Sequence, residues 1–403
     1  MKVSVNVNDL NRMLKVAGKY IDKIGLLAGR LALSVHDGQF EITVVALSGS
    51  QTTVLRQWVE AGAVYNDDFE RVPAEDGFCV VNPKDLAPIK GIKKGSEVTI
   101  EAQNNTVSVI SPGLSFDVST ACAPDNFPDD VFPTPNAYSE ETIEIVPGDC
   151  ECFRYIIPAL SNDISRPEFL GALLKDGALV ATDRHRLHYC PLPALFGTGT
   201  LTGIIAPELL RFIADGHAGT LTEYLEMRQH KVKRGEVTDY AGGIITEYVP
   251  VWHVLEGPGF TFKSKPINGQ FPDFFRVLPG YNVADTAEVD AGALAKTIKP
   301  LYAGWKIGLC MKFSSSPDGV RLDCAGKPGE KAPKPSNRTG VLKGVKLPNL
   351  PVCLNPQYVM DALSGFNGEI EFCLKDCDNP VWIGEFDGYK YGRGAVIMPM
   401  DLF

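Results

Sequence analysis

The sequence lacks any run of the roughly eighteen apolar residues that a membrane-spanning helix needs. Its start, Met1-Lys2-Val3-Ser4-Val5, also lacks the apolar core of a secretory signal peptide. We therefore expect no membrane span, no membrane partner and a cytoplasmic protein.

Closely spaced cysteines are also scarce. Of the ten cysteines, only Cys150 with Cys152 and Cys373 with Cys377 are near neighbours in sequence, and neither pair has the spacing of a zinc ribbon. A reduced protein of the cytoplasm is the simplest interpretation.

Motifs that would indicate a catalyst are missing as well. On a strand, His185 and His188 would point to opposite faces, which argues against a metal site with Cys190. The segment 326–331 lacks the Gly-Lys-Ser/Thr end of a phosphate-binding loop, and no Gly-x-Ser-x-Gly nucleophile elbow occurs. We expect a protein that is not an enzyme and has no metal and no cofactor.

An overall positive charge is absent. Lys and Arg number 39 against 49 Asp and Glu, which gives a net charge of −10. This excludes a protein that is basic all over and coats nucleic acid or anionic membrane, but it leaves a local basic surface open.

What the sequence does contain is one plan repeated three times. Each copy opens with a short strand of alternating apolar residues, followed at once by a segment with helical apolar spacing. The strand positions are Val3, Val5 and Val7, then Ile143 and Ile145, then Ala287 and Val289. The spacing predicts helices over 8–25, 147–160 and 290–306.

A second helix start also recurs at intervals of roughly one third of the chain. Pro83, Pro207 and Pro356 each follow an apolar strand, and proline suits the first helical turn because it has no N–H to leave unpaired. Asn82 and Asn355 are natural N-caps before two of these prolines. The predicted helices are 82–95, 206–219 and 355–367.

A chain of 403 residues exceeds one ordinary single-core domain. We predict an α+β protein of three domains, 1–136, 137–282 and 283–403, each with two helices packed on antiparallel sheet. Residues 325–350 stand outside this plan, because they are rich in Gly and Pro and basic. They predict an exposed basic loop, either merely solvated or in contact with nucleic acid or a partner.

The predicted helices are more basic than the remaining chain. They carry thirteen basic and nine acidic residues, a net charge of +4. Because the whole chain has a net charge of −10, the residues outside these helices have a net charge of −14. Helices that face phosphates on a protein with an acidic exterior would have this distribution, although an ordinary mixed helix surface would too. No recognition-helix or zinc-finger pattern indicates sequence-specific readout.

Five segments together resemble one known family. They are Arg166–Gly171, Val180–Leu187, Gln270–Pro279, Asn355–Leu363 and Val396–Leu402. They resemble, in the same order, motifs of the bacterial sliding clamp, the β subunit of DNA polymerase III. The resemblance implies the DNA clamp fold, in which two chains associate head to tail as a homodimeric ring with helices lining the hole.

A ring of this kind implies a non-catalytic processivity factor in DNA replication. Its implied partners are double-stranded DNA bound without sequence preference, a second copy of the chain, the replicative polymerase catalytic subunit, the clamp loader and other proteins with clamp-binding motifs. A clamp-fold module that sequesters or scaffolds replication partners without encircling DNA is the alternative.

The resemblance also assigns functions to three sets of residues. The partner-peptide pocket would comprise Phe169, Thr182, His185, Arg186, Leu187, Pro272, Arg276, Val277, Val396, Met398, Pro399 and Met400. The DNA-facing set would comprise Arg12, Lys15, Lys19, Lys23, Lys84, Lys90, Lys93, Lys94, Arg154, Arg211, Lys296 and Lys299. The dimer interface would comprise Phe116, Val118, Leu301 and Tyr302, although core packing explains these four almost as well.

Three residues depart from the family pattern near the implied pocket. Arg184 stands where Gly is usual, Leu170 where Asn is usual, and Asp401 where a basic residue is usual. Because two of these changes alter the charge beside the pocket, we expect a partner motif different from that of a typical clamp.

Overall fold

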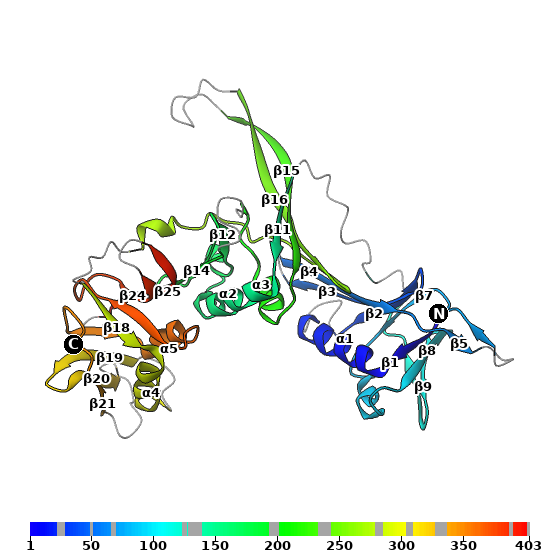
Figure 1. Ribbon diagram of the computed structural model, residues 1–403. Helices are drawn as coiled ribbons and strands as arrows, with labels where there is room; N and C mark the ends of the chain where they lie inside the picture. The colour runs from blue at the N-terminus through cyan, green and yellow to red at the C-terminus, as the bar shows by residue number, and fades with distance from the viewer. Residues whose placement is uncertain are drawn as a thin grey trace. The chain divides into compact units, whose positions relative to one another are not determined.

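The structure is a computed structural model of the whole chain, and it describes residues 1–21, 29–48, 51–65, 70–122, 127, 139–192, 201–232, 243–278, 285–303, 309–326, 337–386 and 390–400. The chain forms two compact units (Figure 1). Unit 1 comprises Met1–Ile145 and His217–Pro266, and unit 2 comprises Val146–Gly216 and Ile267–Phe403.

Unit 1 is built on an antiparallel sheet of eight strands. In spatial order the strands are β11 (Ser139–Ile145), β15 (Gly219–Val232), β16 (Gly243–Gly257), β17 (Phe260–Ser264), β4 (Gln51–Glu60), β3 (Gln39–Ser48), β2 (Leu31–His36) and β7 (Gly77–Val81). The pairing of β17 with β4, in which Phe262 lies opposite Leu55, joins segments about 200 residues apart. The sheet is therefore continuous between the first and second sequence copies.

Helix α1 (Val7–Tyr20) packs on this sheet, as the apolar spacing over 8–25 predicts. Asn6 caps it by accepting a hydrogen bond from the Asn8 N–H at 2.9 Å. The Gln57 side chain on β4 donates to the carbonyl of Met13, and Tyr20 makes an edge contact with Phe262. The apolar side of the helix is thus fixed to β4 and β17, which turns its polar side outward.

A second sheet of unit 1 has an exposed edge. Its order is β1 (Lys2–Asn6), β8 (Glu97–Gln103), β9 (Thr106–Ser111) and β10 (Leu114–Ser119), so β10 is the last strand. A small hairpin of β5 (Val64–Tyr65) and β6 (Arg71–Val72) lies elsewhere in the unit. The turn residues Asn104 and Asn105 have φ of 46° and 65°, as expected for an asparagine-rich hairpin turn.

The helix predicted over 82–95 is wrong. The chain there makes a turn followed by a short 3-10 helix, η1 (Ala87–Gly91). Pro88 lacks the N–H that an α-helix would use at that position, and it disfavours α conformation at Ala87. Pro83 thus suits the start of a helix, but Pro88 prevents the helix from continuing.

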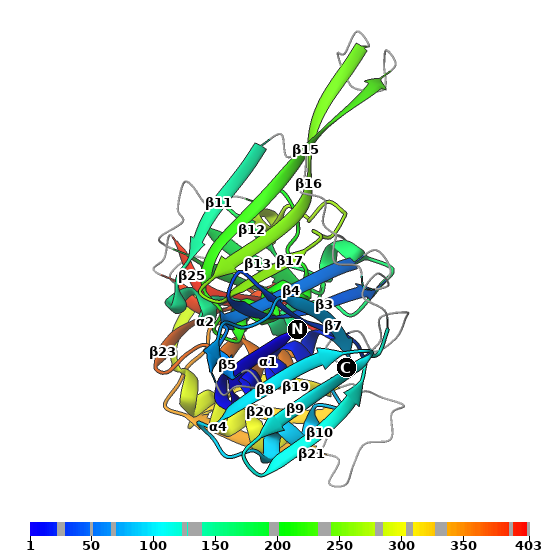
Figure 2. The same ribbon diagram turned by 90° about the vertical axis from the view of Figure 1, so that its right-hand side faces the viewer.

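Strands β15 and β16 extend past their neighbours as a two-stranded ribbon (Figures 1 and 2). Their pairing runs to Val232 opposite Gly243, whereas β11 reaches only Leu225. A shift of register between Tyr224 and Leu225 marks a β-bulge at the start of this ribbon, where strands bend and twist more strongly.

Unit 2 also contains two antiparallel sheets. The larger has the order β12 (Leu173–Lys175), β13 (Ala178–Thr182), β14 (Arg186–Pro191), β25 (Tyr391–Ile397), β24 (Val381–Phe386), β23 (Glu369–Cys373) and β18 (Thr286–Asp290). The smaller has the order β21 (Asn337–Lys343), β20 (Gly319–Gly326), β19 (Leu309–Ser316) and β22 (Val352–Leu354). Pairing of β14 with β25 makes the larger sheet continuous between the second and third sequence copies.

The remaining helices all belong to unit 2. They are α2 (Cys150–Ile156), flanked by the 3-10 turns η3 (Pro147–Asp149) and η4 (Ile157–Ala159), then α3 (Pro207–Ala214), α4 (Ala291–Tyr302) and α5 (Pro356–Leu363). Asp290 and Asn355 cap α4 and α5, and Ala206 provides no side-chain cap for α3. The four predicted helices of this region are therefore confirmed, with shorter bounds.

The prediction of a loop over 325–350 is wrong for residues 325–326, which end β20, and for residues 337–343. Residues 337–343 form β21, which pairs with β20 along its length, and Leu342 is buried. Arg338 donates to the carbonyl of Ala303 at 2.7 Å, so this basic residue caps the C-terminal end of α4. Residues 327–336 lie outside the described residues.

The cysteines differ from the expected reduced set at one pair. Cys152 on α2 and Cys190 on β14 form a disulfide, with Cα atoms 5.7 Å apart, whereas eight cysteines are free. The partners are 38 residues apart in sequence. Sequence spacing could not indicate this pairing, because the contact depends on how α2 packs against β14.

Two searches of the described residues bear on the expected absences. No helix there is long and apolar enough to cross a membrane. Among the same residues, no group of three or more His, Cys, Asp or Glu side chains is arranged to hold a metal ion.

Candidate functional site

The residues expected to bind a partner peptide all lie in unit 2, around the turn between β13 and β14. Thr182 Oγ1 accepts a hydrogen bond from the Arg184 N–H and donates to the Arg186 carbonyl. Asp183 Oδ1 accepts from the N–H groups of His185 and Arg186, both at 3.0 Å. These bonds fix the turn with the side chain of His185 exposed.

Arg184 occupies a backbone conformation that favours glycine. Its φ is 78°, in the left-handed region where a β-carbon costs about 1 kcal/mol. Its side chain is 45% exposed and makes a loose ion pair, 3.8 Å long, with Asp163. Glycine, which is usual at this position in the family that the sequence resembles, would adopt this conformation without strain. The arginine of this chain adopts it with strain.

Arg186 points inward rather than toward a partner. Its guanidinium donates to Asp183, to Asp361 on α5 and to the carbonyl of Pro158, and it lies 4.3 Å from the centre of the Tyr358 ring. The side chain is only 10% exposed. Arg186 thus joins β14 to α5 and η4, and its donors are used within unit 2.

His188, two residues further along β14, is buried against α2. Its Nδ1 donates to the carbonyl of Tyr155 at 2.8 Å, and the two rings are 4.8 Å apart. Burial lowers the pKa of His188 to about 3, although the bond to Tyr155 opposes this shift. The ring is therefore neutral at physiological pH, and it serves packing rather than metal binding.

The C-terminal strand lies against the same turn. Val396 on β25 pairs with Leu187 on β14, and both are buried. Beyond the strand, the Met398 N–H donates to the His185 carbonyl and the Met400 N–H donates to the Cys353 carbonyl. Met398 is 38% exposed, and Pro399 and Met400 are half-buried. Asp401 lies outside the described residues.

The segment 270–278 contacts Leu187 and Val396 through Phe274. Phe274, in the 3-10 turn η7 (Phe274–Arg276), is buried in an apolar cluster with Leu187 and Val396. Phe275 and Val277 are 49% and 36% exposed on either side of Arg276. Pro272 precedes this turn and is half-buried.

The structure therefore brings most of the expected peptide-binding residues around one turn, in two different roles. Leu187 and Val396 form the buried base, whereas His185, Arg276, Val277 and Met398 are exposed. Phe169 and Thr182 are also buried, Phe169 at the end of η5 (Pro167–Phe169). Sequence reasoning missed Asp361 and Tyr358, although both lie within the segment 355–363 that it had singled out.

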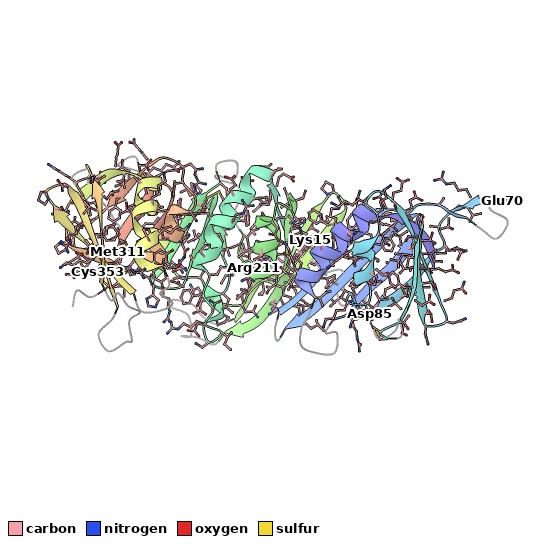
Figure 3. All side chains as sticks on the ribbon, turned by 90° about the horizontal axis from the view of Figure 1, so that it is seen from below. Lys15, Glu70, Asp85, Arg211, Met311 and Cys353 are labelled. Atoms are coloured by element: carbon pink, nitrogen blue, oxygen red, sulfur yellow. A yellow bond between two sulfur atoms is a disulfide. The ribbon has the colours of Figure 1, made fainter. Side chains whose placement is uncertain are left out.

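The expected DNA-facing residues lie on helices and on the turn around η1. Arg12, Lys15 and Lys19 are exposed along the side of α1 opposite its buried residues. Figure 3 labels Lys15 on α1 and Arg211 on α3, each exposed on its own helix. The other exposed members are Lys84, Lys90, Lys93, Lys94, Arg154, Lys296 and Lys299. Lys23 lies outside the described residues.

One of these arginines also has a structural contact. Arg154 on α2 donates to the carbonyl of Ala214 at 2.6 Å, at the C-terminal end of α3, where a positive charge is favourable. The guanidinium of Arg154 thereby joins α2 to α3.

The expected dimer residues lie on or beside the edges of the two smaller sheets. Phe116 and Val118 belong to β10, the edge strand in unit 1, where Phe116 is half-buried and Val118 is buried. Leu301 is buried beneath Gly340 of β21, the edge strand of the smaller sheet in unit 2, and Tyr302 is half-buried. Sequence reasoning missed β21 itself because it assigned this segment to a loop.

Solved structures that resemble this chain over its whole length are β clamps. The β clamp of Helicobacter pylori in complex with carprofen matches all of both chains with a TM-score of 0.75 and 18% identity. The same protein bound to a DNA ligase peptide matches with a TM-score of 0.70 and 19% identity, again over both whole chains. The fold is therefore the DNA clamp fold.

The sequence comparison points to one family within this fold. No protein-family model matches the chain. The β sliding clamp of Salmonella typhimurium is 26% identical over 397 residues, which cover 93% of this chain and 92% of that protein. At low identity but over nearly the whole length, these findings support the assignment of the chain to the bacterial β sliding clamp family.

Proposed function

We propose that this chain is a sliding clamp, a processivity factor that encircles duplex DNA as a homodimeric ring and tethers the replicative polymerase and other partners. The observation that carries the proposal is the correspondence with β sliding clamps in sequence and fold over nearly the entire chain. In this function the protein catalyses no reaction, and it acts in the cytoplasm, where a bacterial replication machinery works.

The distribution of charge supports a passage for DNA along the helices. Exposed lysines and arginines lie on α1, α3 and α4, whereas the outer strand β11 carries Glu140, Glu141 and Glu144. Contacts between such side chains and phosphates are independent of base sequence and weaken with salt. A ring that slides needs contacts of this kind, because its closed topology, rather than tight binding, keeps it on DNA.

Two edge strands support head-to-tail closure. In the described part of the chain, the smaller sheets end in β10 and β21, and an exposed edge is a template for pairing with another chain. Pairing of β10 of one copy with β21 of the next uses two different surfaces, and a second such contact closes the ring. We propose Phe116, Val118, Leu301 and Tyr302 as the side chains beside this interface, and the three domains 1–136, 137–282 and 283–403 as its repeating parts.

The partner site is proposed at the turn between β13 and β14. One relative in the clamp fold has been crystallised with a DNA ligase peptide. In this chain, exposed Met398, Phe275 and Val277 provide apolar contacts beside His185 and Arg276. A peptide with apolar anchors from a polymerase, a clamp loader or another replication protein fits this combination.

Topological retention on DNA tests the proposal. The protein is mixed at about 150 mM salt with a linear plasmid, onto whose ends a closed ring can thread, and the plasmid is then ligated to a circle; free protein is removed by gel filtration, and half of the sample is cut once with a restriction enzyme. A sliding clamp stays on the circle and leaves the cut DNA. Equal retention on both forms would indicate ordinary DNA binding, and no retention on either would favour the module that scaffolds partners without encircling DNA.

Charge reversal refines this test. Lys15→Glu with Lys19→Glu should weaken the equilibrium binding of the protein to linear DNA and reduce the salt dependence of that binding, because each lost phosphate contact lowers the salt slope by about one. Lys175→Glu with Lys346→Glu makes the same change of charge at exposed positions outside the helices and should bind linear DNA as the unaltered protein does.

A further inference from the structure

Two arginines in the turn between β13 and β14 have opposite surroundings. Arg186 is 10% exposed and uses its donors on Asp183, Asp361 and the carbonyl of Pro158. Arg184 is 45% exposed, and its recorded ion pair is the 3.8 Å contact with Asp163. The cation that this turn presents to solvent is therefore that of Arg184.

The Asp163 carboxylate does not depend on Arg184. Its Oδ1 accepts hydrogen bonds from both the N–H and the hydroxyl of Ser165, at 3.1 and 2.6 Å. These two bonds are the main reason that the pKa of Asp163 is lowered, and Arg184 contributes less. An exposed ion pair of this length contributes little to stability, so the pair does not explain why an arginine is present.

The arginine is also held in an unfavourable backbone conformation. Its φ of 78° is fixed by the hydrogen bond from its own N–H to Thr182 Oγ1 and by the neighbouring bonds to Asp183. Glycine would adopt this conformation without strain. Strained residues that persist at exposed positions are often found where a side chain has a function, and here the side chain is a guanidinium that is 45% exposed.

The turn that carries Arg184 is hydrogen-bonded to a segment with exposed apolar side chains. The next residue, His185, receives the hydrogen bond from Met398, which is 38% exposed. Val396, two residues before Met398, packs in one apolar cluster with Phe274. Phe275, the next residue in the sequence, is exposed. Among the described residues, the turn thus combines neighbouring apolar side chains with a positive charge whose recorded ion pair, with Asp163, is 3.8 Å long.

We propose that Arg184 binds a carboxylate of the partner peptide, so that this chain prefers peptides in which acidic residues flank the apolar anchor. The inference rests on the proposed partner site and adds the chemical class of the segment that it selects. A guanidinium that is nearly half exposed should improve affinity about three- to fivefold for such a peptide, and the gain should decrease with salt.

Fluorescence anisotropy with one peptide in three forms tests this. The probe is the DNA ligase peptide that a related clamp binds, used unextended, with two aspartates added at each end, and with two lysines added at each end. We expect the aspartate form to bind best. Arg184→Gly should remove the difference between the aspartate form and the unextended form.

The same variant has a second readout that separates binding from folding. Because glycine relieves the strain, Arg184→Gly should raise the thermal midpoint even as it loses the preference for acidic peptides. Arg321→Gly, an exposed arginine paired with Asp323 on β20, is the matched control and should keep the preference.

The outcomes distinguish this inference from the proposed function. Equal binding of the aspartate and unextended forms, or a preference that survives Arg184→Gly, would overturn the role of Arg184 and leave the partner site standing. Absence of binding by every form up to about 1 mM would overturn the partner site itself, and the inference with it.

Discussion

Arg186 holds the turn between β13 and β14 to the remainder of unit 2, and replacing it tests this interpretation most sharply. Its side chain is 10% exposed, and it neutralises Asp183 and Asp361, whose side chains are 16% and 19% exposed. Replacing it by methionine keeps the unbranched stem of the side chain and leaves two nearly buried carboxylates without a cation. We therefore expect Arg186→Met to destabilise unit 2 strongly.

The magnitude follows from the contacts. Breaking a fully buried ion pair from one side costs about 3–5 kcal/mol, and the residual exposure here reduces this to about 2–3 kcal/mol. Loss of the contact with the Tyr358 ring, 4.3 Å from the guanidinium, adds about 0.5–1 kcal/mol. The expected total is about 3 kcal/mol.

A double-mutant cycle with Asp361→Asn isolates the pair. In a background where the other three tryptophans are replaced by phenylalanine, urea denaturation followed by the fluorescence of Trp382, which is buried in unit 2, gives the free energy of unfolding for each variant. We expect a coupling energy of about 1–2 kcal/mol. Arg321→Met removes an exposed pair with Asp323 and should cost under about 0.5 kcal/mol. An effect of Arg186→Met no larger than that of this control would refute the interpretation.

Three further predictions concern other parts of the chain. Because the folded pKa of His188 is about 3, below its ordinary 6.5, unit 2 should lose stability as pH falls below 6.5, by about 1.4 kcal/mol per pH unit. His188→Asn should flatten this slope in urea denaturation at pH 6.5, 5.5 and 4.5, whereas the exposed His185→Asn should not. Mass spectrometry after alkylation of the unfolded chain without reductant should find Cys152 and Cys190 protected by their disulfide, and ten reactive thiols would contradict this. Reduction should lower the free energy of unfolding of unit 2 by up to about 4 kcal/mol. Phe116→Asp should give monomers by light scattering, whereas Ile110→Asp, at an exposed position of the inner strand β9, should leave the dimer intact.

Local features of the fold could be predicted well from the sequence. Alternating Val3 and Val5 form β1, and Asn355 caps α5 as predicted. Such signals depend on residues within one or two turns of each other. The exception, 82–95, carries a second proline whose effect on the helix outweighs the start signal.

Features that depend on distant contacts could not be predicted in the same way. The pairing of β17 with β4 and of β14 with β25, the disulfide between Cys152 and Cys190, and the ion pair between Arg186 and Asp361 all join segments that are remote in sequence. The resemblance placed Arg186 in the partner site, but only the position of α5 shows where its guanidinium points. Likewise, the glycine-rich composition around β21 concealed a strand that its pairing with β20 stabilises.

The most direct test of the central claim is the form of the purified protein under negative-stain electron microscopy. We expect two-dimensional class averages of closed rings with an open centre and a pseudo-sixfold outline, built from two chains of 43.8 kDa each. The same preparation should give the dimer mass by light scattering. Isolated single chains at micromolar concentration, with and without circular DNA, would contradict the account of this protein as a clamp that encircles DNA.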